Sequence, residues 1–250
     1  MRRIATGGEP TALTDANRNS IRHDSWGAAI TGPIRDALHT DQSGICVYCE
    51  RTIPLAKHQY VPVAKIEHFH PRADAAWAGK STRQWTRSAC CTESAAGSHS
   101  ASKTAWTNLL LACPGTVPHR PDGKTETTCD TSKAESDICA VFHNPKLTHL
   151  VQLVDVERDG RIRPVPGMPA GSEKVINDIL RLNASFLCDE RRKTMARLYR
   201  EYKKAKDRHH GLTPKQKRNY ASQIRRQADQ LGTEYPSSML AVAKEIESRA

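Results

Sequence analysis

The chain has 250 residues, with 38 Lys and Arg against 27 Asp and Glu and a formal net charge of +11. This length can bury a substantial core, and the basic excess favours a polyanionic partner such as nucleic acid. No apolar stretch approaches the roughly 20 residues of a membrane-spanning helix, and MRRIATGGEP at the start lacks the apolar region of a signal peptide. We therefore expect no membrane association, a cytoplasmic location and eight cysteines that are ligands, catalytic thiols or core residues.

The positive charge is concentrated in one segment. Residues 181–230 hold 15 Lys and Arg against 5 Asp and Glu, whereas residues 1–180 hold 21 against 19. Seven of the eight cysteines lie before residue 140. The sequence thus predicts a cysteine-rich zone followed by a separate basic zone.

Three segments are expected along the chain, with boundaries at residues 1–44, 45–145 and 146–250. The first is polar, with a helix expected between Trp26 and Leu38 after Pro33. In the second, ICVYCERTIP indicates a short strand and a knuckle, and QYVPVAKIEHF alternates like a half-buried strand. TAWTNLLLAC has an apolar pattern, and Asp130 favours the start of a short helix. Residues 75–104 have the composition of an insertion.

The third segment begins with a hairpin, because two β-rich stretches flank Asp159-Gly160, a dipeptide typical of tight turns. An apolar stripe from Ile179 to Tyr202 then indicates an amphipathic helix. Two further helices are expected at about 214–231 and 237–249.

Four cysteines have the spacing of a metal site. Cys46 and Cys49 form a Cys-x-x-Cys knuckle, which lets two thiolates reach one tetrahedral Zn²⁺, and Cys113 and Cys129 can complete the site. The loop between the second pair is long, but its Pro and Gly content suits an excursion whose ends stay together. The alternative is that these are buried or redox thiols.

Further chemistry-bearing residues lie between and after the cysteines. Glu67-His68 stand within IEHFHPR, Asn108 within WTNLLLAC, and Asp130 and Lys133 follow the last cysteine of the set. This order resembles that of the zinc-bearing HNH nucleases with a ββα-metal active site. The resemblance implies an α+β fold, with a zinc-bearing ββα-metal module followed by the hairpin and a basic helical C-terminal region.

The resemblance also implies roles for these residues in phosphodiester hydrolysis. His68 would be the general base, and Glu67 and Asp130 would hold Mg²⁺ or Mn²⁺ through oxygen. Asn108 would tie the loop backbone together and orient His68, while Arg72 and Lys133 would contact phosphate. Zinc at the four cysteines would be structural.

Other interpretations of single residues stay open. His70 is equally near and could be a second metal ligand or a phosphate contact. Asn108 could cap a helix or turn, and Trp106 is expected to anchor the core rather than stack on bases.

CVYCE, IEHFHPR, WTNLLLAC and LRLNASFL are similar to the PtuB-type HNH subunit of Septu-like and retron-linked anti-phage defence systems. That family implies a PtuA-like ATPase partner of the ABC/SMC type. The long 113–129 loop, Asp130 in place of the family's Asn, and an insertion at about 78–105 depart from the family pattern.

The basic segment admits three interpretations. It could bind nucleic-acid backbone, dock on an acidic partner, or be an ordinary solvated surface. We expect the first two, with contacts from Arg191, Arg192, Lys203 and Lys204.

Two rival functions remain at this point. One is a non-catalytic zinc-ribbon protein that binds nucleic acid, and the other is a ribonuclease toxin on the same module. Against the first, a pure binder has no use for an imidazole beside two carboxylates. The sequence does not distinguish DNA from RNA, although we favour DNA.

Overall fold

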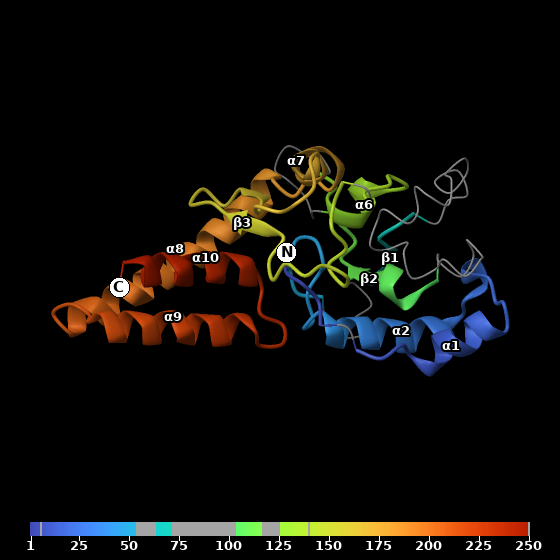
Figure 1. Ribbon diagram of the computed structural model, residues 1–250, viewed down its shortest axis with the longest axis horizontal. Helices are drawn as coiled ribbons and strands as arrows, with labels where there is room; N and C mark the ends of the chain where they lie inside the picture. The colour runs from blue at the N-terminus through green and yellow to red at the C-terminus, as the bar shows by residue number, and fades with distance from the viewer. Residues whose placement is uncertain (6, 54–63, 72–103, 117–125, 140, 250) are drawn as a thin grey trace.

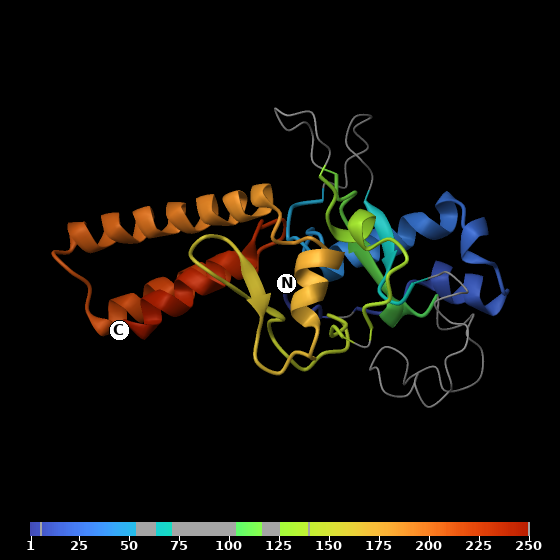
Figure 2. The ribbon, with the colours of Figure 1, turned by 90° about the horizontal axis from the view of Figure 1, so that it is seen from above.

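The computed structural model describes residues 1–5, 7–53, 64–71, 104–116, 126–139 and 141–249 (Figures 1 and 2). It is a mixed α+β structure with two small antiparallel strand pairs. Figure 1 shows a helical arm extending to one side, with the first helices and the first strand pair on the other and the N-terminus between them. Arg72 and the 78–105 insertion, of which only residues 104 and 105 are covered, lie outside the described residues.

Two strands and a short helix form the centre of the cysteine-rich zone. β1 (Lys65–His68) pairs antiparallel with β2 (Leu109–Ala112), so that Glu67 is opposite Leu110, and α6 (Cys129–Lys133) follows. All four side chains of β2 are buried, which explains why this strand is a continuous apolar run. Within the apolar stretch TAWTNLLLAC, β2 begins only at Leu109, because Trp106–Asn108 form a 3-10 turn, η3.

The N-terminal segment packs on this strand pair. It contains α1 (Thr11–Arg18), the 3-10 turn η1 (His23–Ser25) and α2 (Ala28–Asp41). The helix α2 lies against β1 and β2, and its Ile34 and Leu38 are fully buried in the core that it shares with the strands. It begins at Ala28, ahead of Pro33, so this proline lies inside the helix rather than before it.

The predicted hairpin is confirmed. β3 (Val154–Val156) pairs with β4 (Ile162–Pro164) around a turn in which Gly160 has φ +84°. A Cβ built on Gly160 would lie 2.0 Å from the carbonyl oxygen of Cys188, so the turn requires glycine both for its backbone and for its packing.

The amphipathic stretch after the hairpin forms two helical segments rather than one. α7 (Ser172–Lys174) runs into a π-helical turn, η4 (Val175–Ile179), and α8 (Ser185–Arg208) begins afterwards. Arg181 between them has φ +50°, a left-handed conformation that a helix cannot contain. Ile179 and Leu182 therefore precede the long helix instead of continuing its stripe.

α8 packs with two further helices in a second apolar core. α9 (Pro214–Ala228) begins with a Thr213–Gln216 capping box, and α10 (Pro236–Ser248) returns beside it (Figure 1). Met195, Leu198 and the buried faces of α9 and α10 make up this core. The sequence predicts a helix that reaches Leu231, but α9 ends at Ala228 and Leu231 is exposed.

Candidate functional site

The four predicted zinc ligands meet in the interior. Cys46, Cys49, Cys113 and Cys129 are all buried, their sulfur atoms all lie within 4.8 Å of one another, and the Cys49 and Cys113 Sγ atoms are 3.6 Å apart. This is a compact, all-thiol donor set of the kind that holds tetrahedral zinc. The four cysteines could therefore hold a zinc ion, as the sequence predicts.

The long loop between Cys113 and Cys129 returns to its starting point. Thr116 forms an isolated bridge with Thr127, and the Thr128 backbone N–H donates to the Gly115 carbonyl at 2.7 Å. A Cβ on Gly115 would lie 2.0 Å from the Thr128 carbonyl oxygen, so only glycine permits this approach. These contacts at the two loop ends therefore bring the Cys113 and Cys129 sulfurs together.

The surroundings of the four cysteines favour the thiolate form of Cys113 in particular. Hydrogen bonds from Cys129, Cys46 and Cys49, with the Arg51 guanidinium nearby, lower the pKa of Cys113. Arg51 donates to Cys113 Sγ at 3.5 Å. Burial instead raises the pKa of Cys46 and Cys129. A cation shared by all four sulfurs would reconcile these opposite shifts, because thiolates, not thiols, are the ligands of zinc.

Two carboxylates, one from β1 and one from α6, lie close together. Glu67 is 4% exposed and Asp130 comes from the first turn of α6. Burial, together with a hydrogen bond to Asp130, raises the pKa of Glu67 to about 8. Burial works in the same direction on Asp130, but the hydrogen bond from Glu67 and the Lys65 ammonium outweigh it and lower the Asp130 pKa. A hard divalent cation bound by both carboxylates would offset the cost of burying their negative charge.

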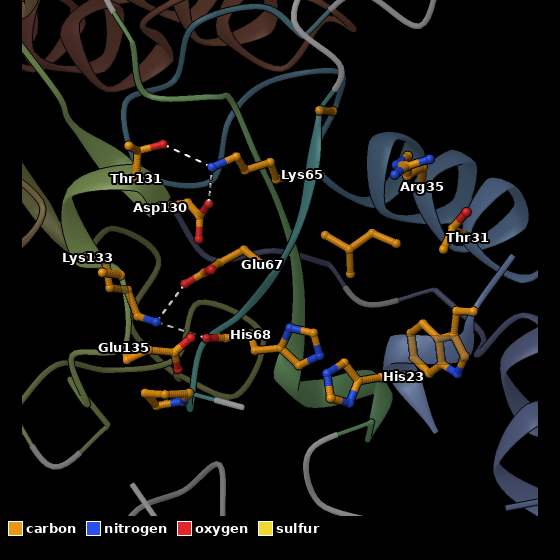
Figure 3. Close-up of a pocket in the computed structure, with 15 residues that line it drawn as sticks. His23, Thr31, Arg35, Lys65, Glu67, His68, Asp130, Thr131, Lys133 and Glu135 are labelled. Atoms are coloured by element: carbon orange, nitrogen blue, oxygen red, sulfur yellow. Dashed lines mark hydrogen bonds and ion pairs between the residues drawn. The ribbon is translucent and has the colours of Figure 1, made fainter. Parts of the chain in front are cut away.

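Two lysines form ion pairs with these carboxylates (Figure 3). Lys65 Nζ is 3.0 Å from Asp130 Oδ2, and Lys133 Nζ is 2.8 Å from Glu67 Oε1. Lys133 also donates to the His68 carbonyl at 3.0 Å, and it is only 1% exposed. The prediction that Lys133 contacts phosphate is therefore wrong, because its ammonium is buried and committed to Glu67 and to the end of β1.

Asn108 ties two segments together, as predicted. Its side-chain carbonyl accepts from the His70 backbone N–H at 2.8 Å, and its amide donates to the His70 carbonyl at 3.2 Å. The Phe69 N–H donates in turn to the Asn108 carbonyl at 3.0 Å. These bonds fix the chain just beyond β1 and hence the position of His68. Asn108 is thus a backbone clamp rather than a helix cap.

His68 and Glu67 point away from each other. Adjacent residues of a strand alternate between its faces, and Figure 3 shows the Glu67 carboxylate turned toward α6 and the His68 ring turned toward His23. The His68 and His23 ring centroids are 5.8 Å apart in an edge-to-face arrangement. The structure brings Glu67 and Asp130 together, but it holds the His68 imidazole on the other side of the strand.

All three of these residues nevertheless line one pocket. The pocket has a volume of about 560 Å³ and is bounded by β1, α6 and the N-terminal segment. The last contributes residues that the sequence did not single out: His23, Trp26, Thr31 and Arg35. No local pattern could have found them, because no spacing relates them to the motifs around Glu67 and Asp130.

His70 does not belong to this pocket. Its Nδ1 is 3.4 Å from the Asp137 carboxylate, and Cys139 lies beside them. Cys139 is disulfide-bonded, which corrects the expectation that all eight cysteines are ligands, catalytic thiols or core residues. His70 is therefore grouped with Asp137 and Cys139 as a possible metal ligand, and it is not among the residues that line the pocket of Glu67 and Asp130.

The four expected basic contacts separate into two kinds. Arg191 is 3% exposed and donates to the carbonyls of Gly160 at 3.2 Å and Leu182 at 2.8 Å. Its predicted role in nucleic-acid binding is wrong, because its guanidinium holds the hairpin turn against α8. The other three are exposed, and one of them, Arg192, pairs with Asp189.

No family model and no curated protein matches this chain. Among the helices that the structure describes, none combines the length and apolar character required to span a bilayer.

Proposed function

We propose that this chain is a metal-dependent endonuclease of the HNH type that hydrolyses phosphodiester bonds, with DNA as the favoured substrate. One observation carries the proposal. Two antiparallel strands and a helix lie beside a four-cysteine cluster, and they present a pair of carboxylates and an imidazole to a single pocket. Paired carboxylates and a histidine at one cleft are what metal-assisted phosphodiester hydrolysis requires.

Each residue then has a chemical task. Bound Mg²⁺ or Mn²⁺ supplies charge neutralisation at the phosphate and at the departing oxygen. Glu67 and Asp130 would hold this ion through their carboxylate oxygens. His68 accepts the proton of the attacking water, a role suited to an imidazole, which titrates near neutral pH. Asn108 keeps the His68 backbone in place, and Lys133 offsets the charge of Glu67.

The decisive experiment removes the imidazole of His68, the proposed general base. His68→Ala deletes an imidazole without touching a cysteine ligand, so the variant should stay folded while losing cleavage of plasmid DNA in Mg²⁺ or Mn²⁺. Exposed His209 at the end of α8 provides the matched control, since His209→Ala should cut like the wild type. Circular dichroism checks the fold of both variants. A fully active His68→Ala protein would overturn the mechanism.

A second candidate is a non-catalytic zinc-ribbon protein that binds nucleic acid. The buried cysteine cluster and the exposed lysines of α8 favour it, since both serve binding without chemistry. The same assay separates the two: a wild-type protein that binds DNA and RNA but cuts neither in Mg²⁺ or Mn²⁺ is such a binder. Cleavage of RNA alone would instead indicate the ribonuclease toxin.

The cellular setting follows from the resemblance to PtuB-type subunits. We propose a cytoplasmic effector of an anti-phage system that works with a PtuA-like ABC/SMC-type ATPase. Support comes from the two-part organisation, in which a candidate nuclease module is joined to a helical arm with its own core. Co-expression with an ATPase encoded beside it, followed by co-purification, tests the partnership.

A further inference from the structure

The N-terminal segment forms one wall of the candidate active-site pocket. Thr31 and Arg35 stand one turn apart on α2, so they share a face, and both line the pocket. Ile34 and Leu38 on the buried face anchor α2 to the strand pair. Figure 3 shows α2 across β1 from α6, with the strand between them. Arg35 is therefore held at a defined place relative to Glu67 and His68.

Arg35 differs from the other cations of this pocket. Lys65 and Lys133 are each within 3.0 Å of a carboxylate oxygen. Within the described part of the chain, Arg35 forms no ion pair, and its buried Nε has no hydrogen-bond acceptor. A buried guanidinium N–H without an acceptor is costly, and such groups in folded proteins call for a missing partner. Because Arg35 lines the pocket, an anion that enters the pocket can supply acceptors for its guanidinium.

We propose that Arg35 binds a phosphate of the nucleic-acid substrate on the α2 side of the cleft. The planar guanidinium fork matches the oxygens of a phosphodiester better than an ammonium does. Lys65 and Lys133 each already contact a carboxylate oxygen, so Arg35 is the cation of this wall that is left to meet an anionic backbone. This assignment rests on the proposed nuclease function for the identity of the anion, and it makes Arg35 a substrate-binding residue rather than a metal ligand.

The test compares Arg35→Gln and Arg35→Lys with the wild type. Arg18→Gln is the matched control, because Arg18 is an exposed arginine at the end of α1 and does not line the pocket. The measurements are kcat and KM for an oligonucleotide in Mg²⁺, the Kd for the same DNA at two salt concentrations in the His68→Ala background, and the shift in melting temperature caused by inorganic phosphate.

Arg35→Gln should raise KM and Kd by about 10-fold or more, as expected for loss of a charge-assisted contact. The salt dependence of Kd should weaken by about one phosphate contact. Arg35→Lys should recover part of the affinity, because it restores the charge without the fork. The Gln variant should also lose the stabilisation by phosphate, whereas Arg18→Gln should match the wild type throughout.

The outcomes separate this inference from the proposed function. If the wild type cuts DNA and Arg35→Gln equals it in KM, Kd and salt dependence, the inference is overturned and the nuclease stands. If the wild type cuts nothing but phosphate stabilises it through Arg35, the anion site stands and the nuclease falls. A wild type that neither cuts nor responds to phosphate overturns both.

Discussion

Glu67→Gln should change how the stability of this protein depends on pH. Burial, together with the hydrogen bond to Asp130, raises the pKa of Glu67 to about 8 in the folded state, against 4.5 for an ordinary glutamate. Between these two values the folded carboxyl keeps its proton while the unfolded one has lost it. Linkage then requires stability to fall as pH rises through this window, by about 1.4 kcal/mol per pH unit. Over the whole window the titration of Glu67 contributes a loss of up to about 5 kcal/mol.

Glutamine removes this titration but keeps much of the geometry. Its side-chain carbonyl can still accept from the Tyr48 hydroxyl, which lies 2.9 Å from Glu67 Oε1, and from Lys133. The stability difference between Glu67→Gln and the wild type should therefore grow with pH from about 5 to 8 in Mg²⁺-free buffer. Adding Mg²⁺ should stabilise the wild type at pH 8 and leave the variant unaffected.

Urea unfolding of both proteins at pH 5, 6, 7 and 8, followed by circular dichroism, measures this difference. Glu173→Gln is the control, since Glu173 is exposed in α7. Titrating groups that do not contact Glu67 cancel in the comparison because both proteins share them. A stability difference that stays constant from pH 5 to 8 would refute the reasoning, because Glu67 would then be ionised in the folded protein.

Three further predictions concern the zinc cluster, the clamp and the arm. Cys129→Ser should lose one zinc per chain in elemental analysis and become less soluble, whereas Cys188→Ser, outside the cluster, should keep the metal. Asn108→Ala breaks two buried hydrogen bonds, so urea unfolding should show a loss of about 2–4 kcal/mol and cleavage assays a lower rate; a variant as stable as the wild type would contradict the clamp. Charge reversal at exposed Lys203 and Lys204 should weaken nucleic-acid binding and reduce its salt dependence without loss of stability, and unchanged binding would make this surface an ordinary solvated one.

Local patterns predicted much of the backbone. The Asp159-Gly160 turn, the fully apolar β2 and the buried stripe of α8 all follow from neighbours along the chain. The presence of both helices and short strands follows from such patterns, because turn chemistry and hydrophobic periodicity report the structure of a few consecutive residues. The knuckle spacing likewise indicated the cysteine cluster, although only folding could show that Cys113 and Cys129 meet the first pair.

Tertiary packing decided what the site contains. From the sequence, Lys133 and Arg191 are expected to be exposed cations. In the structure Lys133 is buried against Glu67, and Arg191 is buried against the Gly160 turn. Arg35 carries no signal in the sequence, and it reaches the pocket because α2 packs on β1 and β2. A charged residue has the same local preferences whether it faces water or a buried partner. Which of these occurs depends on side chains far away in the chain, whose contacts exist only once the core has formed.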